Sequence, residues 1–158
     1  MHDEGEITMS TREFIPYLSV TGAKEAVAFY SRVFETEPAL LLNMPDGRVM
    51  HCEFRFGGAR FFLSEELPEH GGTPSPASLG ATTVAIHLYV ADCDAMVAHM
   101  KSNGAEVVME PTEVFWGERF ARVRDPFGHE WGITTRLHDM TPAEIQAAAA
   151  KLFESMAD

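Results

Sequence analysis

The sequence predicts an α+β fold in which one β-α-β-β-β unit occurs twice and a C-terminal helix follows. The chain superposes on itself without a gap when it is shifted by seventy residues, so that Gly47 falls on Gly117 and Gly58 on Gly128. The same order of strand-like and helical segments runs along both halves. The agreement of segment type along the whole shift indicates an internal repeat. Aliphatic and aromatic residues also match across it: Leu18 and Leu88, Val20 and Val90, Val27 and Val97, Phe61 and Trp131, Leu63 and Ile133.

The first unit is expected within residues 13–66. Residues 23–34 read as a helix because their apolar side chains recur on one face. The Met44-Pro45-Asp46-Gly47 segment is typical of a hairpin turn, and a Gly-Gly pair at 57–58 is typical of a second one. Strands are expected at residues 14–20, 39–42, 49–56 and 60–64.

The second unit is expected within residues 83–136, after a linker at 67–82 that is rich in Pro, Gly and Ser. Asp92 is expected to cap its helix, and Pro111 to interrupt the strand that follows. In the last hairpin, Asp-Pro opens a turn and Gly128 supplies the positive φ that closes it. Strands are expected at residues 83–90, 107–109, 119–124 and 130–135.

The two ends of the chain differ in character. Residues 1–12 are polar and acidic, predict a loosely attached lead, and lack the basic start and apolar centre of a signal peptide, so we expect a cytoplasmic protein. Within the tail at 137–158, Thr141 and Glu144 form a capping-box pattern that starts a helix ending near residue 156. The single apolar face of this helix either packs on its own domain or docks on a partner subunit.

Composition excludes several classes of function. The formal net charge of −12 repels phosphate backbones and anionic lipid, so we expect no nucleic-acid partner. No apolar run is long enough to span a membrane. Cys52 and Cys93 lack CxxC spacing, and in a reducing compartment they are expected to be buried small apolar side chains.

A cavity follows from the repeat. The helix of each unit covers one face of its sheet and leaves the other face open, and two open faces can together enclose a hollow. Because side chains alternate along a strand, residue parity separates the helix-facing row from the open row. The open row is expected to hold Ile15, Tyr17, Ser19, Arg60, Phe62, Ser64, Ala85, His87, Tyr89, Glu130, Gly132 and Thr134.

Several segments, in this order, resemble the vicinal-oxygen-chelate superfamily, and most closely its PhnB-like branch. They are IPYL, AVAFYSRVF, HLYV, FWG, DPFGHEWGI and TPAEI. The superfamily includes glyoxalase I, extradiol dioxygenases, fosfomycin-resistance enzymes and bleomycin-binding proteins. The resemblance runs from about Phe14 to Phe153, and it implies two βαβββ modules that form a curved sheet around a cavity. It also implies a homodimer, in which modules are sometimes exchanged between chains.

Enzymes of that superfamily hold a divalent metal with ligands from the first and last strand of each half. The matching positions here are Ile15, Phe62, Ala85 and Gly132, and none of these side chains has a donor atom. We therefore expect no metal and no cofactor. The alternative is a displaced site formed by His87, Glu130 and one further ligand. Glu53 and His51 lie in a neighbouring strand whose inward row the sequence leaves open.

Two functions are weighed, together with a structural or regulatory dimer that has no ligand. The first is a metal-free protein that binds a small, partly aromatic or amphipathic molecule. The second is a lyase or isomerase that uses the displaced metal site, or acid–base catalysis by His87 with Glu130 or Glu53. Some of the candidate residues also have a purely structural alternative. His87 would then be a hydrogen-bonded histidine in the cavity, Trp116 would pack at a subunit contact, and Glu130 would pair with Arg60 or Arg122. The ligand-binding residues are expected to be Tyr17, Phe62, His87, Tyr89, Trp116 and Arg122.

Overall fold

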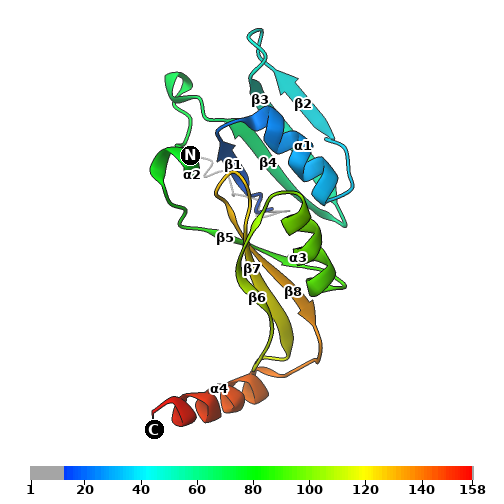
Figure 1. Cartoon of the computed structure of the whole chain (residues 1–158), viewed down its shortest axis with the longest axis vertical. Helices are drawn as coiled ribbons and strands as arrows, with labels where there is room; N and C mark the ends of the chain where they lie inside the picture. Colours follow the sequence, from blue (N-terminus) through cyan, green and yellow to red (C-terminus); the bar gives the residue numbers. More distant parts are fainter. Residues whose placement is uncertain (1–12, 158) are drawn as a thin grey trace, which may run out of the picture.

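A computed structural model describes residues 13–157, and the acidic lead at 1–12 lies outside the described residues. The first module forms a four-stranded sheet in the order β1-β4-β3-β2, with β1 parallel to β4 and the other pairs antiparallel (Figure 1). One helix, α1, covers one face of this sheet. The elements are β1 (Tyr17–Val20), α1 (Ala23–Val33), β2 (Leu40–Asn43), β3 (Val49–Phe56) and β4 (Ala59–Glu65).

The second module repeats this topology with the strand order β5-β8-β7-β6, and β5 is parallel to β8. The predicted α+β fold with two βαβββ modules and a C-terminal helix is confirmed, and the two sheets remain separate. The elements are β5 (Ala85–Tyr89), α3 (Cys93–Ser102), β6 (Glu106–Val114), β7 (Glu118–Arg124), β8 (Glu130–Arg136) and α4 (Pro142–Met156).

The repeat is visible in the backbone of the turns. Gly47 and its counterpart Gly117 have φ of 88° and 84°, and Gly58 and its counterpart Gly128 have φ of 80° and 89°. This left-handed region is open to glycine and costly for residues with a Cβ atom. The four glycines matched by the shift therefore perform the same task in the two halves.

The expectation that Pro111 interrupts its strand is wrong. Strand β6 continues to Val114, and its pairing with β7 shifts register between Val107 and Met109 and again between Met109 and Thr112. Strand β6 is the edge of the second sheet, where a residue without an N–H group costs no ladder hydrogen bond on the solvent side.

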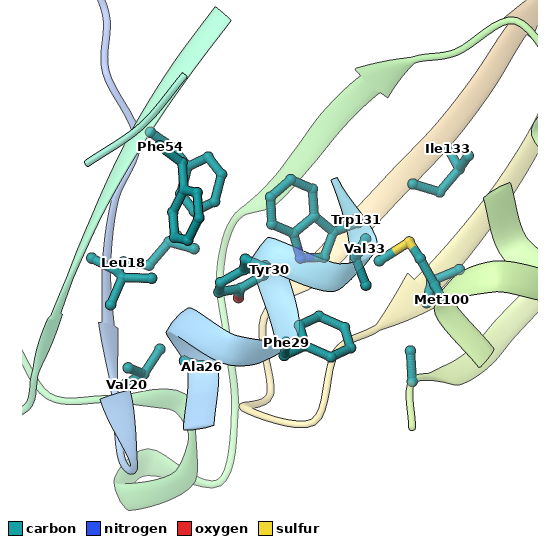
Figure 2. Close-up of a cluster of buried hydrophobic side chains, with 14 of the residues drawn as sticks. Leu18, Val20, Ala26, Phe29, Tyr30, Val33, Phe54, Met100, Trp131 and Ile133 are labelled. Carbon is teal, nitrogen blue, oxygen red and sulfur yellow. The ribbon is translucent and has the colours of Figure 1, made fainter. Parts of the chain in front are cut away.

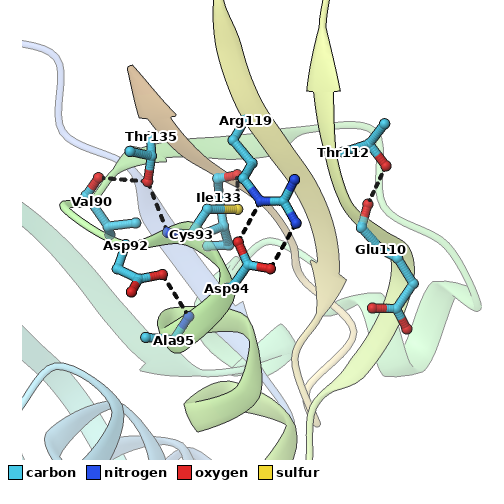
Figure 3. Close-up of polar contacts among 10 residues, drawn as sticks. All are labelled: Val90, Asp92, Cys93, Asp94, Ala95, Glu110, Thr112, Arg119, Ile133 and Thr135. Carbon is cyan, nitrogen blue, oxygen red and sulfur yellow. Dashed lines mark hydrogen bonds and ion pairs between the residues drawn. The ribbon is translucent and has the colours of Figure 1, made fainter. Parts of the chain in front are cut away.

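Helix α3 is tied to its sheet by polar contacts at its N-terminus (Figure 3). The carboxylate of Asp92 accepts the N–H of Ala95 at 3.0 Å, which confirms the predicted cap. The N–H of Cys93 donates to the Thr135 hydroxyl of β8 at 2.8 Å, and Arg119 of β7 pairs with Asp94. These contacts hold the helix against the same sheet face as its apolar residues.

The predicted linker carries short helical turns at Pro68–His70 (η1) and Pro76–Leu79 (α2). Its Ser75 is fully buried, and the Ser75 hydroxyl donates to Glu66 at 2.6 Å. The Ser78 hydroxyl donates to the same carboxylate at 2.6 Å. The linker is therefore fastened to the end of β4.

One apolar core joins the two modules (Figure 2). Tyr30 of α1 is fully buried, and its ring lies 5.2 Å from Phe61 of the first sheet and 5.9 Å from Trp131 of the second. Both sheets therefore turn their helix-bearing faces toward this core, and their open faces point away from it. The predicted helix-facing residues Leu18, Val20, Phe61, Leu63, Trp131 and Ile133 are all buried.

Burial raises the pKa of Tyr30 well above its ordinary value, and the charge of Asp125 raises it further. Because the folded pKa exceeds the unfolded one, this group contributes its full stability below about pH 10 and loses it as the pH rises further. Above about pH 10, we expect the free energy of unfolding to fall with pH more steeply in the wild type than in Tyr30→Phe. The difference between the two slopes should be up to about 1.4 kcal/mol per pH unit. Urea unfolding on both sides of that pH measures it. Equal slopes for the two proteins would contradict the assignment.

Helix α4 begins at the predicted capping box, since the Thr141 hydroxyl accepts the Glu144 N–H and the Glu144 carboxylate accepts the Thr141 N–H. It projects from the end of the second sheet (Figure 1), and none of its residues is buried. Phe153 is 60% exposed, although its ring makes an edge contact with Phe115. Of the two alternatives for the apolar face of this helix, packing on its own domain is therefore wrong for most of its length.

Candidate functional site

The open face of the first sheet carries a chain of hydrogen-bonded side chains. The Tyr17 hydroxyl lies 2.8 Å from Nδ1 of His51, and Nε2 of His51 lies 3.2 Å from the Glu53 carboxylate. The Phe62 ring meets both the Tyr17 and His51 rings edge-on, with centroids 5.7 and 5.0 Å away. Cys52, between the two β3 residues, is fully buried, so His51 and Glu53 belong to the open row that the sequence left undecided.

A hollow of about 510 Å³ lies beside Tyr17. This volume is within the range of small-molecule sites. Strands β1 and β4 form its floor, the β2–β3 hairpin one wall, and the linker another. Its lining includes Tyr17, Ser19, Met44, Met50, Ser64 and Leu67.

The open face of the second sheet carries a second aromatic group. His87 stacks on Phe120 with centroids 5.8 Å apart, and its Nε2 lies 2.8 Å from the Thr134 hydroxyl. Nearby, the Glu118 carboxylate accepts the Tyr89 hydroxyl at 2.8 Å and the Trp116 indole N–H at 2.7 Å. These contacts fix the orientation of three predicted ligand-binding rings.

Glu130 is held between two arginines. Arg124 donates to one of its oxygens at 3.0 Å, and Arg122 pairs with the other. Hydrogen bonds from Arg124, and then from Arg122, lower the pKa of Glu130. Of the two partners that the sequence offered for Glu130, Arg122 is confirmed, and Arg60 pairs with Glu13 instead. An ionised carboxylate with both oxygens engaged is a weak base.

The residues at the family's metal-ligand positions do not fit a metal. A Cβ atom on Gly132 would lie 2.9 Å from Cε2 of Phe120 and 3.1 Å from Nδ1 of His87, so a ligating side chain has no room there. In the first module the Phe62 ring itself occupies the matching position, packed between Tyr17 and His51. Within residues 13–157, no three His, Cys, Asp or Glu side chains are grouped as a metal site requires.

The structure separates the predicted site residues into two groups on two faces. Tyr17, Phe62 and Glu53 share the open face of the first sheet. His87, Tyr89 and Trp116 gather on the second sheet, as do Arg122 and Glu130. Phe120 and Glu118 could not be predicted as site residues, and Thr134 is predicted only as a member of the open row. Their contacts with His87, Tyr89 and Trp116 depend on how the strands of the second sheet pair.

The two four-stranded sheets share one βαβββ topology, and each has one open face. This arrangement places the chain in the class of proteins built from paired βαβββ modules. A model of the Glyoxalase/Bleomycin resistance protein/Dioxygenase superfamily matches residues 14–133, and the chain belongs to this superfamily. An uncharacterized protein of Mycobacterium tuberculosis is 37% identical over 135 residues, which cover 84% of this chain and 79% of that protein. The corresponding Mycobacterium bovis protein is equally similar, with 89% of its length covered.

Solved structures agree on the fold. A glyoxalase-related enzyme from Fulvimarina pelagi superposes with a TM-score of 0.63 at 16% identity, covering 80% of this chain and 88% of that one. The PhnB protein of Bacillus cereus superposes with a TM-score of 0.60 at 19% identity, covering 78% of this chain and 99% of that one. The predicted resemblance to the PhnB-like branch is confirmed at the level of fold.

Proposed function

We propose that this protein binds a small, partly aromatic or amphipathic molecule without the help of a metal. The observation that carries the proposal is the filling of two of the four expected metal-ligand positions, by Phe62 in one module and by Phe120 against Gly132 in the other. Aromatic rings with hydrogen-bonded polar tips replace the metal ligands on both open faces. Such surfaces stack planar ligands and orient them through a few polar groups.

We further propose that the complete binding cavity forms in a homodimer, between the first sheet of one chain and the second sheet of its partner. The open faces point away from the shared core, so one chain does not bring Tyr17 opposite Tyr89. Both tyrosines are more than half exposed, at 56% and 53%. The unpartnered apolar side of α4, with Phe153 and Met156, also favours a second copy as a neighbour.

A complementation experiment tests the dimeric cavity. Tyr17→Ala damages one face and Tyr89→Ala the other, and each variant alone should bind the neutral dye Nile red about ten-fold or more weakly than the wild type. A refolded mixture should recover about a quarter of the wild-type sites, because half of the dimers are mixed and each mixed dimer holds one intact pair of faces. Lys101→Ala, on the exposed side of α3, is the control. A mixture that recovers no sites would contradict a cavity shared between chains.

The enzymatic alternative has less support. His87 is engaged by Thr134, and both oxygens of Glu130 are engaged by arginines, so neither group is free to act as a base. We also propose a cytoplasmic location, which is supported by the two buried unpaired thiols of Cys52 and Cys93. Among residues 13–157, no helix is both long and apolar enough to cross a bilayer.

A further inference from the structure

The chain from Tyr17 through His51 to Glu53 has a defined direction. A carboxylate can only accept hydrogen bonds, so the proton of the neutral imidazole is on Nε2, where it faces Glu53 at 3.2 Å. Nδ1 then carries a lone pair, and the Tyr17 hydroxyl donates its proton to it at 2.8 Å. This is the order of a nucleophile–base–carboxylate triad, with a phenol in the first position.

The Tyr17 oxygen retains its lone pairs when its proton is given to His51. The Tyr17 side chain lines the hollow of about 510 Å³, whose wall is otherwise mainly apolar and includes Met44, Met50 and Leu67. Ser64 adds a hydroxyl to the same hollow, beside Ser19 in the parallel register of β1 and β4. A ligand here meets the Tyr17 side chain, whose oxygen can accept its proton, and an apolar surface that can hold its ring.

We propose that this hollow binds a phenol, or another aromatic compound with a weakly acidic hydroxyl group, and takes up its proton through Tyr17 and His51. The ligand O–H bond breaks and its proton bonds to the Tyr17 oxygen, while the original Tyr17 proton bonds to Nδ1 of His51. The products are a phenolate and an imidazolium, so protons and charge balance and no other reactant is needed. The inference rests on the proposed binding function and names the class of ligand.

The charged groups around the relay suit this transfer. Glu53 faces the imidazolium directly, and Arg55 lies 3.6 Å from the far oxygen of Glu53. Arg60 of β4 lies over the Phe62 ring at 5.7 Å, and its guanidinium is engaged by the Glu13 carboxylate. On the β2 side, the residues opposite Glu53 and His51 are Leu40 and Leu42. The other ionisable groups near the relay and the hollow are Glu13, which pairs with Arg60, Glu65, which accepts two backbone N–H groups, and His70.

The test uses para-nitrophenol, whose phenolate absorbs visible light and whose neutral form does not. With the full-length wild type in excess, the midpoint of the probe's ionisation should fall by about one to two pH units relative to the free probe. His51→Gln can keep the hydrogen bonds to Tyr17 and Glu53 but is not basic, and it should return the midpoint to that of the free probe while binding persists. Tyr17→Phe should do the same. His138→Gln, an exposed histidine near α4, should behave as the wild type.

The non-ionisable analogue para-nitroanisole distinguishes a failure of the proton relay from a failure of the binding function. If the anisole binds and nitrophenol shows no shift in its ionisation midpoint, the relay is wrong and the binding function stands. If a shift is unchanged in both His51→Gln and Tyr17→Phe, the relay is also wrong. If neither probe binds while Nile red binding also fails, both the relay and the proposed function are overturned.

Discussion

Replacing Asp125 by alanine should lower the free energy of unfolding by about 3–5 kcal/mol. This carboxylate is 4% exposed and lies where the two modules meet. It accepts the Tyr30 hydroxyl and, at 2.9 Å, the Trp131 indole N–H, together with the backbone N–H groups of Phe127 and His129 at 2.9 and 3.0 Å. Alanine would leave two buried side-chain donors without an acceptor, and each such group costs about 1–3 kcal/mol.

Urea unfolding followed by circular dichroism measures this loss. Asp46→Ala is the matched control, because this aspartate lies in the hairpin turn of the first module and is exposed. Its pairing with Arg48 at the surface is screened by solvent, so this variant should lose far less stability than Asp125→Ala. A similar loss in the two variants would mean that the carboxylate of Asp125 does not hold the modules together.

Gly128→Ala should lower the free energy of unfolding by about 2–4 kcal/mol, because alanine would both strain the left-handed backbone and clash with a neighbouring residue. The φ of Gly128 is +89°, and an added Cβ would lie 2.7 Å from Cβ of Pro76 in the linker helix α2. Its repeat counterpart Gly58 has a φ of +80° and no atom within 4 Å of an added Cβ. Gly58→Ala should therefore cost only the backbone strain, about 1–2 kcal/mol.

The difference between the two alanine variants measures how firmly the linker is seated on the last hairpin. Thermal unfolding of both variants at one pH provides it. Equal destabilisation would show that α2 moves away from Gly128 without cost, and that the linker is not part of the folded core.

The parts of the fold that depend on local chemistry could be predicted from the sequence. The turn glycines, the Asp92 cap and the capping box at Thr141 each depend on a few neighbouring residues, and all are confirmed. The course of β6 through Pro111 could not be predicted, because it depends on β6 being an edge strand. The separation of α4 from the body depends on what surface lies beside it, which no periodicity encodes.

The candidate site was accessible to sequence reasoning only in part. Parity placed Tyr17 and Phe62 on one row, and they do lie side by side in the register of β1 and β4. Residue parity could not show on which face of the first sheet His51 lies. The pairing of β2 with β3 shifts register at Met50, and this shift exchanges the helix-facing and open positions along β3. Phe120 was missed because its position over Gly132 follows from side-chain length and strand pairing together.

Elemental analysis of the protein, purified without chelator and passed through gel filtration, tests the central claim most directly. Phenyl rings fill two of the four positions from which the superfamily's enzymes hold their ion, so transition metals should be found far below one ion per chain. Treatment with a chelator should then leave the affinity for Nile red unchanged. One firmly retained transition-metal ion per chain, with dye affinity lost on its removal, would contradict the account.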